Sequence, residues 1–152
     1  MSMKIENLIK QPGFEDNYHK VIVNLIFSGN WIRDENVRAL KDFDVLPQHY
    51  NVLRIIKGKH PLPVSPGEIK EVLIDKSNDL TRLLDKLEKN GWVKRELCPT
   101  NRRRMDVTLT PEGQKILNQM NKAVSRISNG VAKNISVREA GQLSNLLDKM
   151  RG

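Results

Sequence analysis

The fold is decided by residues 65–113, which read SPGEIKEVLIDKSNDLTRLLDKLEKNGWVKRELCPTNRRRMDVTLTPEG. At the start of this stretch, residues 65–68 supply an N-cap serine, a first-turn proline and a capping-box glutamate. The sequence therefore predicts a helix here. We expect it to be short, with Ile69, Val72 and Leu73 facing inward.

A second helix is predicted after a turn at residues 73–75. Asn90 and Gly91 form its C-terminal stop, because glycine readily adopts the left-handed conformation that ends many helices. Apolar side chains at i, i+3, i+4 and i+7 mark one face of this helix as part of the core. That face consists of Leu80, Leu83, Leu84 and Leu87.

Two strand-like stretches come next, at residues 93–97 and 105–109. Between them we expect a polar loop, CPTNRRR at residues 98–104, which is too long for a tight hairpin turn. Residues 110–112 supply an N-cap threonine, a proline and an acidic residue, which together predict another helix. Two consecutive short helices followed by a β-hairpin predict a winged helix-turn-helix.

Helical patterns also lie on both sides of this stretch. We expect a helix over residues 15–41, a second one from Pro47 to Gly58 and an extended connection at residues 60–64. A second S-x-x-E capping box at residues 136–139 predicts a last helix. The expected fold class is mainly α with a small β-hairpin wing (α+β), in a single chain of 152 residues.

Within this chain we assign residues 44–110 to a winged helix-turn-helix lobe. Residues 14–43 and 111–152 form a helical region with more apolar surface than one small lobe needs, and such a surface normally marks an interface. We therefore expect these helices to dimerise. The candidate dimerisation residues are Tyr18, Val21, Ile22, Leu25, Val124, Ile127, Leu143, Leu146, Leu147 and Met150.

The charge of the chain is concentrated in one part of the sequence. The formal net charge is +8, and residues 76–104 contribute +5 of it through nine basic and four acidic side chains. A general need for solubility does not explain this distribution, whereas a nucleic-acid partner does. Double-stranded DNA is the partner we expect.

Helical geometry indicates which side chains would meet DNA. At about 100° per residue from the leucine face, Asn78 and Arg82 point away from the core, and both residue types can contact base edges. The arginines at 102–104 repel one another unless anions screen them, as the phosphates beside a minor groove would. The alternatives are an ordinary solvent-facing helix and a solvated loop. The candidate DNA-binding residues are Lys76, Ser77, Asn78, Thr81, Arg82, Lys86, Arg102, Arg103 and Arg104.

Four short stretches carry a family resemblance: TRLLDKLE at 81–88, GWVKR at 91–95, NRR at 101–103 and VTLTPEG at 107–113. They resemble the MarR family of dimeric winged-helix transcriptional regulators, whose pattern reads TRLxDxLE, GxVxR, DxR and VxLTxxG. Resemblance in order and spacing extends over residues 15–150. The chain departs from the pattern at Asn101, where the family has aspartate, and at Ile74–Asp75, where it often has glycine.

The resemblance implies an obligate homodimer, formed by the N-terminal helix and the two C-terminal helices. Such a dimer would repress transcription from pseudo-palindromic operators, with its recognition helices one DNA turn apart. It also implies release by a small-molecule effector bound between the dimerisation helices and the DNA-binding lobe. Tyr18, Trp31 and Tyr50 are candidates to line that crevice, although each also fits a core position.

No catalytic chemistry is evident in the sequence, and we predict that the protein is not an enzyme. His19, His49 and His60 are too scattered for a metal motif, and we expect neither a metal nor a cofactor. Cys98 lies near Arg95 and the arginine run, where cations would favour a reactive thiolate. One interpretation of Cys98 is a redox role. The alternative is that Cys98 packs as a small buried hydrophobic residue.

Two other functions compete with transcriptional regulation. The first is a winged-helix protein-interaction module that uses the dimer surface without sequence-specific DNA binding. The second is an enzyme acting on nucleic acid, which we rank last. The chain lacks a secretory signal and a segment long enough to span a membrane, so we expect a cytoplasmic protein without a membrane partner.

Overall fold

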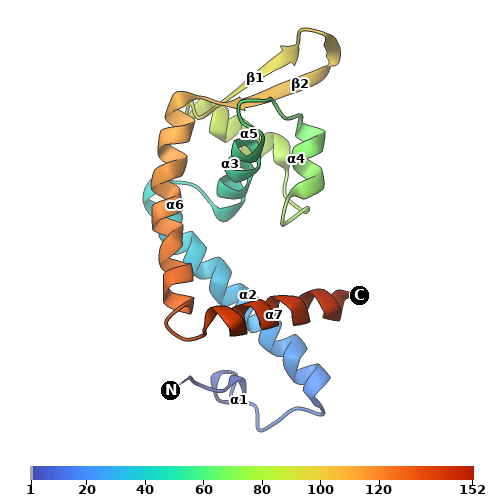
Figure 1. Cartoon of the computed structure of the whole chain (residues 1–152), viewed down its shortest axis with the longest axis vertical. Helices are drawn as coiled ribbons and strands as arrows, with labels where there is room; N and C mark the ends of the chain where they lie inside the picture. Colours follow the sequence, from blue (N-terminus) through green and yellow to red (C-terminus); the bar gives the residue numbers. More distant parts are fainter. Residues whose placement is uncertain (1) are drawn as a thin grey trace. The chain divides into compact units, whose positions relative to one another are not determined.

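Seven α-helices, one short 3-10 helix and a two-stranded hairpin make up residues 2–152, the part of the chain that the computed structural model describes (Figure 1). In chain order these are α1 (Ile5–Leu8), α2 (Asn17–Leu40), η1 (Lys41–Phe43), α3 (Pro47–Lys59), α4 (Pro66–Val72), α5 (Leu80–Lys89), β1 (Val93–Cys98), β2 (Asn101–Leu109), α6 (Pro111–Val131) and α7 (Val137–Arg151). The predicted fold class, mainly α with one antiparallel hairpin, is confirmed. No helix among residues 2–152 is long and apolar enough to cross a membrane. The chain divides into two compact units, one ending at Glu35 and one comprising Asn36–Gly152.

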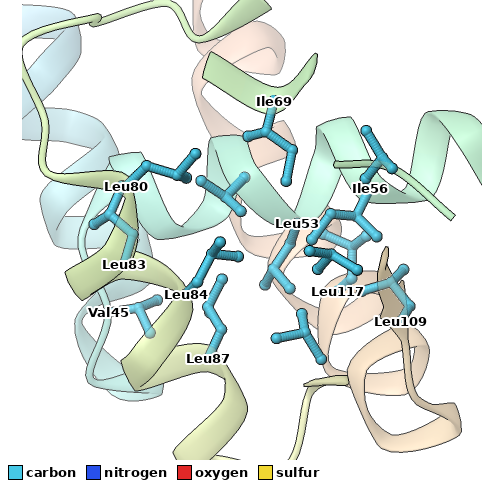
Figure 2. Close-up of a cluster of buried hydrophobic side chains, with 14 of the residues drawn as sticks. Val45, Leu53, Ile56, Ile69, Leu80, Leu83, Leu84, Leu87, Leu109 and Leu117 are labelled. Atoms are coloured by element: carbon cyan, nitrogen blue, oxygen red, sulfur yellow. The ribbon is translucent and has the colours of Figure 1, made fainter. Parts of the chain in front are cut away.

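The core of the second unit lies between α3, α4, α5, α6 and the hairpin (Figure 2). All four leucines of the predicted α5 face are buried there, and each contributes roughly 1.5–3 kcal/mol relative to an exposed side chain. Ile69 and Leu73 are buried as predicted, but Val72 is 59% exposed. Val72 is the last residue of α4, and the chain then leaves the helix so that Leu73 enters the core instead.

The hairpin is antiparallel, and Val93 pairs with Leu109 while Leu97 pairs with Met105. The extended connection predicted before α4 is present, because Val64 forms a bridge with Val107 through two backbone hydrogen bonds of 3.0 and 2.9 Å. The expected seven-residue loop is wrong. Only residues 99 and 100 separate the two strands, and the arginine run belongs to β2.

A register shift explains how three arginines fit into a strand. Cys98 pairs with Asn101, and the next residue back, Leu97, pairs with Met105. Residues 102–104 are therefore inserted in β2 without counterparts on β1. They form a bulge at the end of the wing, so their side chains are not fixed by regular strand pairing.

The beginning of α5 also differs from the sequence prediction. The helix starts at Leu80 rather than directly after Asp75, because the Asp79 side chain accepts a hydrogen bond from the Arg82 N–H and acts as the N-cap. Asp75 Oδ1 accepts hydrogen bonds from both the N–H and the hydroxyl group of Ser77, which form a turn before the helix. Lys76, Ser77 and Asn78 therefore lie in a loop.

In the second unit, α6 begins at the predicted cap, where Thr110 Oγ1 accepts from the Gly113 N–H, and runs away from the hairpin (Figure 1). The capping box at Ser136 opens α7 as predicted. The candidate dimerisation residues of α7 are largely uncovered in the single chain, with Leu146 63% exposed and Leu143 51% exposed.

In the first unit, the short helix α1 packs against the first half of α2, a contact that the sequence did not indicate. Ile5 is 4% exposed, and Lys20 Nζ lies 2.5 Å from Glu6 Oε1. Tyr18 is 81% exposed and Ile22 52%, so Tyr18 is not a core residue of the single chain.

Candidate nucleic-acid interface

The first turn of α5 presents the most accessible polar side chains of the predicted recognition helix. Thr81 is exposed, and 86% of the Arg82 side chain is accessible, with its Nε 3.8 Å from Asp79 Oδ2. An exposed ion pair of this length is weak, so Arg82 can exchange Asp79 for a stronger acceptor. Lys86 lies one turn further on, half-buried, with its Nζ 3.5 Å from Asp44 Oδ2.

The loop before α5 is held by its own backbone and by α3. Asn78 Nδ2 donates to the Asp75 carbonyl at 3.1 Å, while Gln48 Nε2 donates to Asn78 Oδ1 at 3.4 Å. Lys76 Nζ donates to the Glu71 carbonyl at 2.7 Å. The prediction that Asn78 points outward from a helix face is therefore wrong, because its amide is used in fixing the loop.

Sequence reasoning missed the α3 side chains that hold this loop. Asn51 Oδ1 accepts from the Ile74 N–H at 3.1 Å, and Gln48 lies three residues earlier, on the same side of α3. The i, i+3 spacing of two polar residues was the available signal. It could not indicate which distant groups these two side chains bond.

Arg95 attaches the wing to α5. Its Nη2 lies 2.6 Å from Asp85 Oδ1 and 3.1 Å from Glu88 Oε1, and its backbone N–H also donates to Glu88. Only 21% of the Arg95 side chain is accessible. These hydrogen bonds lower the pKa of Glu88 and keep its carboxylate charged. The wing and α5 are thus joined at the base of β1.

The three arginines of the wing have different surroundings. Arg102 and Arg103 are exposed, and no carboxylate among the described residues pairs with either guanidinium group. Asn101 Oδ1 accepts from the Arg103 backbone N–H at 3.1 Å, so the neutral asparagine orders the bulge through the main chain. Arg104 is half-buried and forms ion pairs with Glu68 and Asp106. Among the described residues, the wing therefore presents two accessible cations that have no carboxylate partner.

These elements can be compared with known proteins. A model of the MarR family matches residues 47–105. The multiple antibiotic resistance protein MarR of Salmonella typhimurium is 34% identical over 128 residues, which cover 83% of this chain and 88% of the relative. The chain belongs to the MarR family. The corresponding protein of Salmonella typhi matches with the same identity and coverage.

Solved structures agree with the MarR-family assignment. Wild-type MarR of E. coli in its apo form is 26% identical, with a TM-score of 0.66 over 99% of this chain and 98% of that chain. A mutant E. coli MarR complexed with operator DNA is 27% identical, with a TM-score of 0.72 over 98% and 99% of the two chains. A MarR-like protein of Bacillus cereus has a TM-score of 0.77 at 19% identity, which shows the shared fold alone.

This MarR-family chain also contains a cavity of about 1140 Å³ within its second unit, beside α3, α6 and α7. At its wall Tyr50 donates to Asn121 Oδ1 at 2.7 Å, and Arg54 Nη1 donates to the same oxygen at 3.2 Å. Burial raises the pKa of Tyr50. Of the three aromatic residues considered for an effector crevice, Tyr50 lines this cavity, whereas Trp31 lines a separate cavity in the first unit.

Cys98 is partly buried at the end of β1, with its Sγ 3.4 Å from Thr100 Oγ1. The Thr100 hydroxyl group, rather than a neighbouring cation, is the main cause that lowers the pKa of Cys98. Within residues 2–152, no group of three or more His, Cys, Asp or Glu side chains is placed to hold a metal ion.

Proposed function

We propose that this MarR-family transcriptional regulator is a homodimeric repressor that binds pseudo-palindromic operators. The observation that carries the proposal is the combination of an open first turn on α5 with two wing arginines that pair with no carboxylate among residues 2–152. Thr81 and Arg82 would read bases in the major groove, and Arg102 with Arg103 would enter the adjacent minor groove. The protein would act in the cytoplasm.

Further side chains would contact the phosphate backbone. Lys86 is available because its exposed partner Asp44 is a weak competitor for a cation near phosphates. Lys76 and Ser77 lie on the loop just before the N-terminus of α5, where the helix dipole also favours anions. Asn78 would position this loop and contact DNA only with the amide hydrogen that remains free.

We infer the homodimer from exposed apolar side chains that a second copy would cover. In the first unit these include Tyr18, Val21 and Ile22, and in the second unit Leu143, Leu146 and Met150. Leu25, Val124, Ile127 and Leu147 are partly buried and would extend the contact. We therefore assign residues 14–43 and 111–152 to dimerisation and residues 44–110 to DNA binding.

The cavity beside α3 is our candidate effector site. Apolar side chains such as Val124 and Ile127 line it, while Arg54 and the Tyr50 hydroxyl group supply polar contacts. This combination suits a small anion with an apolar body. Ile74 and Asn51 also line the cavity and belong to the contact that holds the loop before α5, so a bound molecule would touch the DNA-binding elements.

Selection of binding sites from random DNA, using the full chain, tests the proposal. We expect one pseudo-palindromic sequence to be enriched, and its affinity to fall steeply with salt as phosphate contacts release counterions. Arg103→Gln should reduce the slope of log Kd against log salt by about one. Arg82→Gln should change the enriched sequence instead.

Lys122→Gln, which removes an exposed cation from the middle of α6, is the matched control and should change neither property. No enriched sequence, together with a salt response that is flat for all variants, would overturn the proposal. That result would favour the protein-interaction module.

A further inference from the structure

Arg104 is the third residue of the arginine run, but its guanidinium group is directed toward α4. Its Nη2 lies 3.2 Å from Glu68 Oε2, and its Nε lies 3.0 Å from Asp106 Oδ1. The first contact joins residues that are 36 positions apart in the sequence. Arg104 thus bridges a carboxylate of its own strand and a carboxylate of another element.

Glu68 is a rigid anchor for this contact because its side chain is already fixed by the first turn of α4. Its Oε2 accepts from the Ser65 N–H at 2.7 Å, and its own N–H donates to Ser65 Oγ at 3.2 Å. Lys59 Nζ lies 3.7 Å from the other carboxylate oxygen. The Ser65 N–H also lowers the pKa of Glu68, so the anchor remains charged at neutral pH.

The part of the wing next to this contact has few other attachments. Residues 102–104 lack counterparts on β1, and the Asn101 side chain fixes only the Arg103 main chain. Without a further restraint, the bulge would sample many conformations in the free protein. Binding would then carry the cost of ordering it.

We propose that Arg104 is a positioning residue, which with Glu68 holds the bulge of β2 against α4 and presents Arg102 and Arg103 to DNA. This inference rests on the proposed function. It also reassigns Arg104 from a direct DNA contact to an internal one, because its Nε donates to Asp106 and its Nη2 donates to Glu68.

The direction in which Glu68→Gln changes operator affinity separates this role from a simple effect of charge. Glu68→Gln removes a negative charge near the DNA-binding surface, and loss of charge repulsion alone would tighten DNA binding. Glutamine still completes a capping box, so α4 should remain folded. If Glu68 positions the wing, the variant should bind its operator about threefold to tenfold more weakly, as expected for the loss of one charge-assisted contact.

Glu71→Gln is the matched control, since it removes the same charge from an exposed position of the same helix. It should bind as tightly as the wild type, or more tightly. Arg104→Gln should weaken binding as much as Glu68→Gln does, and the double variant should add little to either loss. Unlike Arg103→Gln, Arg104→Gln should leave the salt slope unchanged, because it removes no phosphate contact.

Amide hydrogen exchange of the wing in the DNA-free protein gives a second readout. Exchange at residues 101–105 should accelerate in Glu68→Gln and Arg104→Gln and stay unchanged in Glu71→Gln. Unaltered exchange, or tighter operator binding by Glu68→Gln, would overturn the positioning role. If the wild type selects no operator, the proposed function fails, while the exchange experiment still decides whether Glu68 orders the wing.

Discussion

Gly113 lies so close to Trp92 that a Cβ atom at position 113 would be 1.9 Å from the Trp92 carbonyl oxygen. Thr110 Oγ1 donates to the Gly91 carbonyl at 2.6 Å, and the Thr110 N–H donates to the Trp92 carbonyl at 3.1 Å. The start of α6 is therefore seated on the turn between α5 and β1. This contact gives a physical reason for the threonine and glycine in the LTxxG part of the family pattern.

Gly113→Ala should consequently destabilise the protein by about 2–3 kcal/mol, because the obstructing atoms belong to the backbone and cannot turn aside. Gly130→Ala is the control in the same helix, where a Cβ meets nothing within 4 Å. It should stabilise the protein by about 0.5–1 kcal/mol. Urea denaturation measures both effects, and equal results for the two variants would contradict the contact.

Loss of the Arg95 contact should loosen the wing from α5. We expect Arg95→Met to lower the free energy of unfolding by about 1–2 kcal/mol, since two carboxylates lose a largely covered partner. Lys94→Met breaks an ion pair whose two side chains are about 60% accessible, so its effect should be below about 0.5 kcal/mol. Thermal unfolding of both variants compares them, and a larger loss for Lys94→Met would contradict this assignment.

The N-cap of α5 can be tested with two variants of equal charge. Asp79→Ala should cost about 1 kcal/mol of stability through the lost cap, whereas Asp79→Asn retains a capping oxygen and should cost little. Both variants remove the same negative charge near Arg82. A weaker operator affinity for Asp79→Ala than for Asp79→Asn would therefore measure the order of the first turn of α5, and equal stabilities would show that the cap is unimportant.

His49 should make stability depend on pH. Burial, assisted by Lys86, lowers its pKa below the usual value of about 6.5, while Asp44 acts in the opposite direction. Because the unfolded state takes up the proton first, stability is complete above pH 6.5 and declines as the pH falls toward the lowered pKa.

Denaturant unfolding at several pH values tests this dependence. His49→Asn keeps an acceptor for the Leu46 N–H, which donates to His49 Nδ1 at 3.1 Å, and it removes the titration. The variant should lose less stability than the wild type between pH 7 and pH 5. An identical pH dependence in both proteins would exclude His49 as the cause.

The sequence correctly predicted the features that depend on residues close together in the chain. The starts of α3, α4, α6 and α7 follow from caps and prolines within three or four positions. The inward face of α5 follows from periodicity, because leucines at these intervals must share one side of a helix. Local rules failed at Asn78, because its side chain donates to the Asp75 carbonyl and accepts from Gln48, and these hydrogen bonds favour a loop over an earlier helix start.

The amino-acid sequence by itself determined the winged helix-turn-helix, the family pattern and the accumulation of positive charge in residues 76–104. Tertiary structure decided which of those charges remain available. Arg102, Arg103 and Arg104 are identical in type and consecutive in the chain, yet Glu68 engages only the third. The physical reason is distance in space, since a partner 36 residues away is placed beside the wing only when α4 packs against β2.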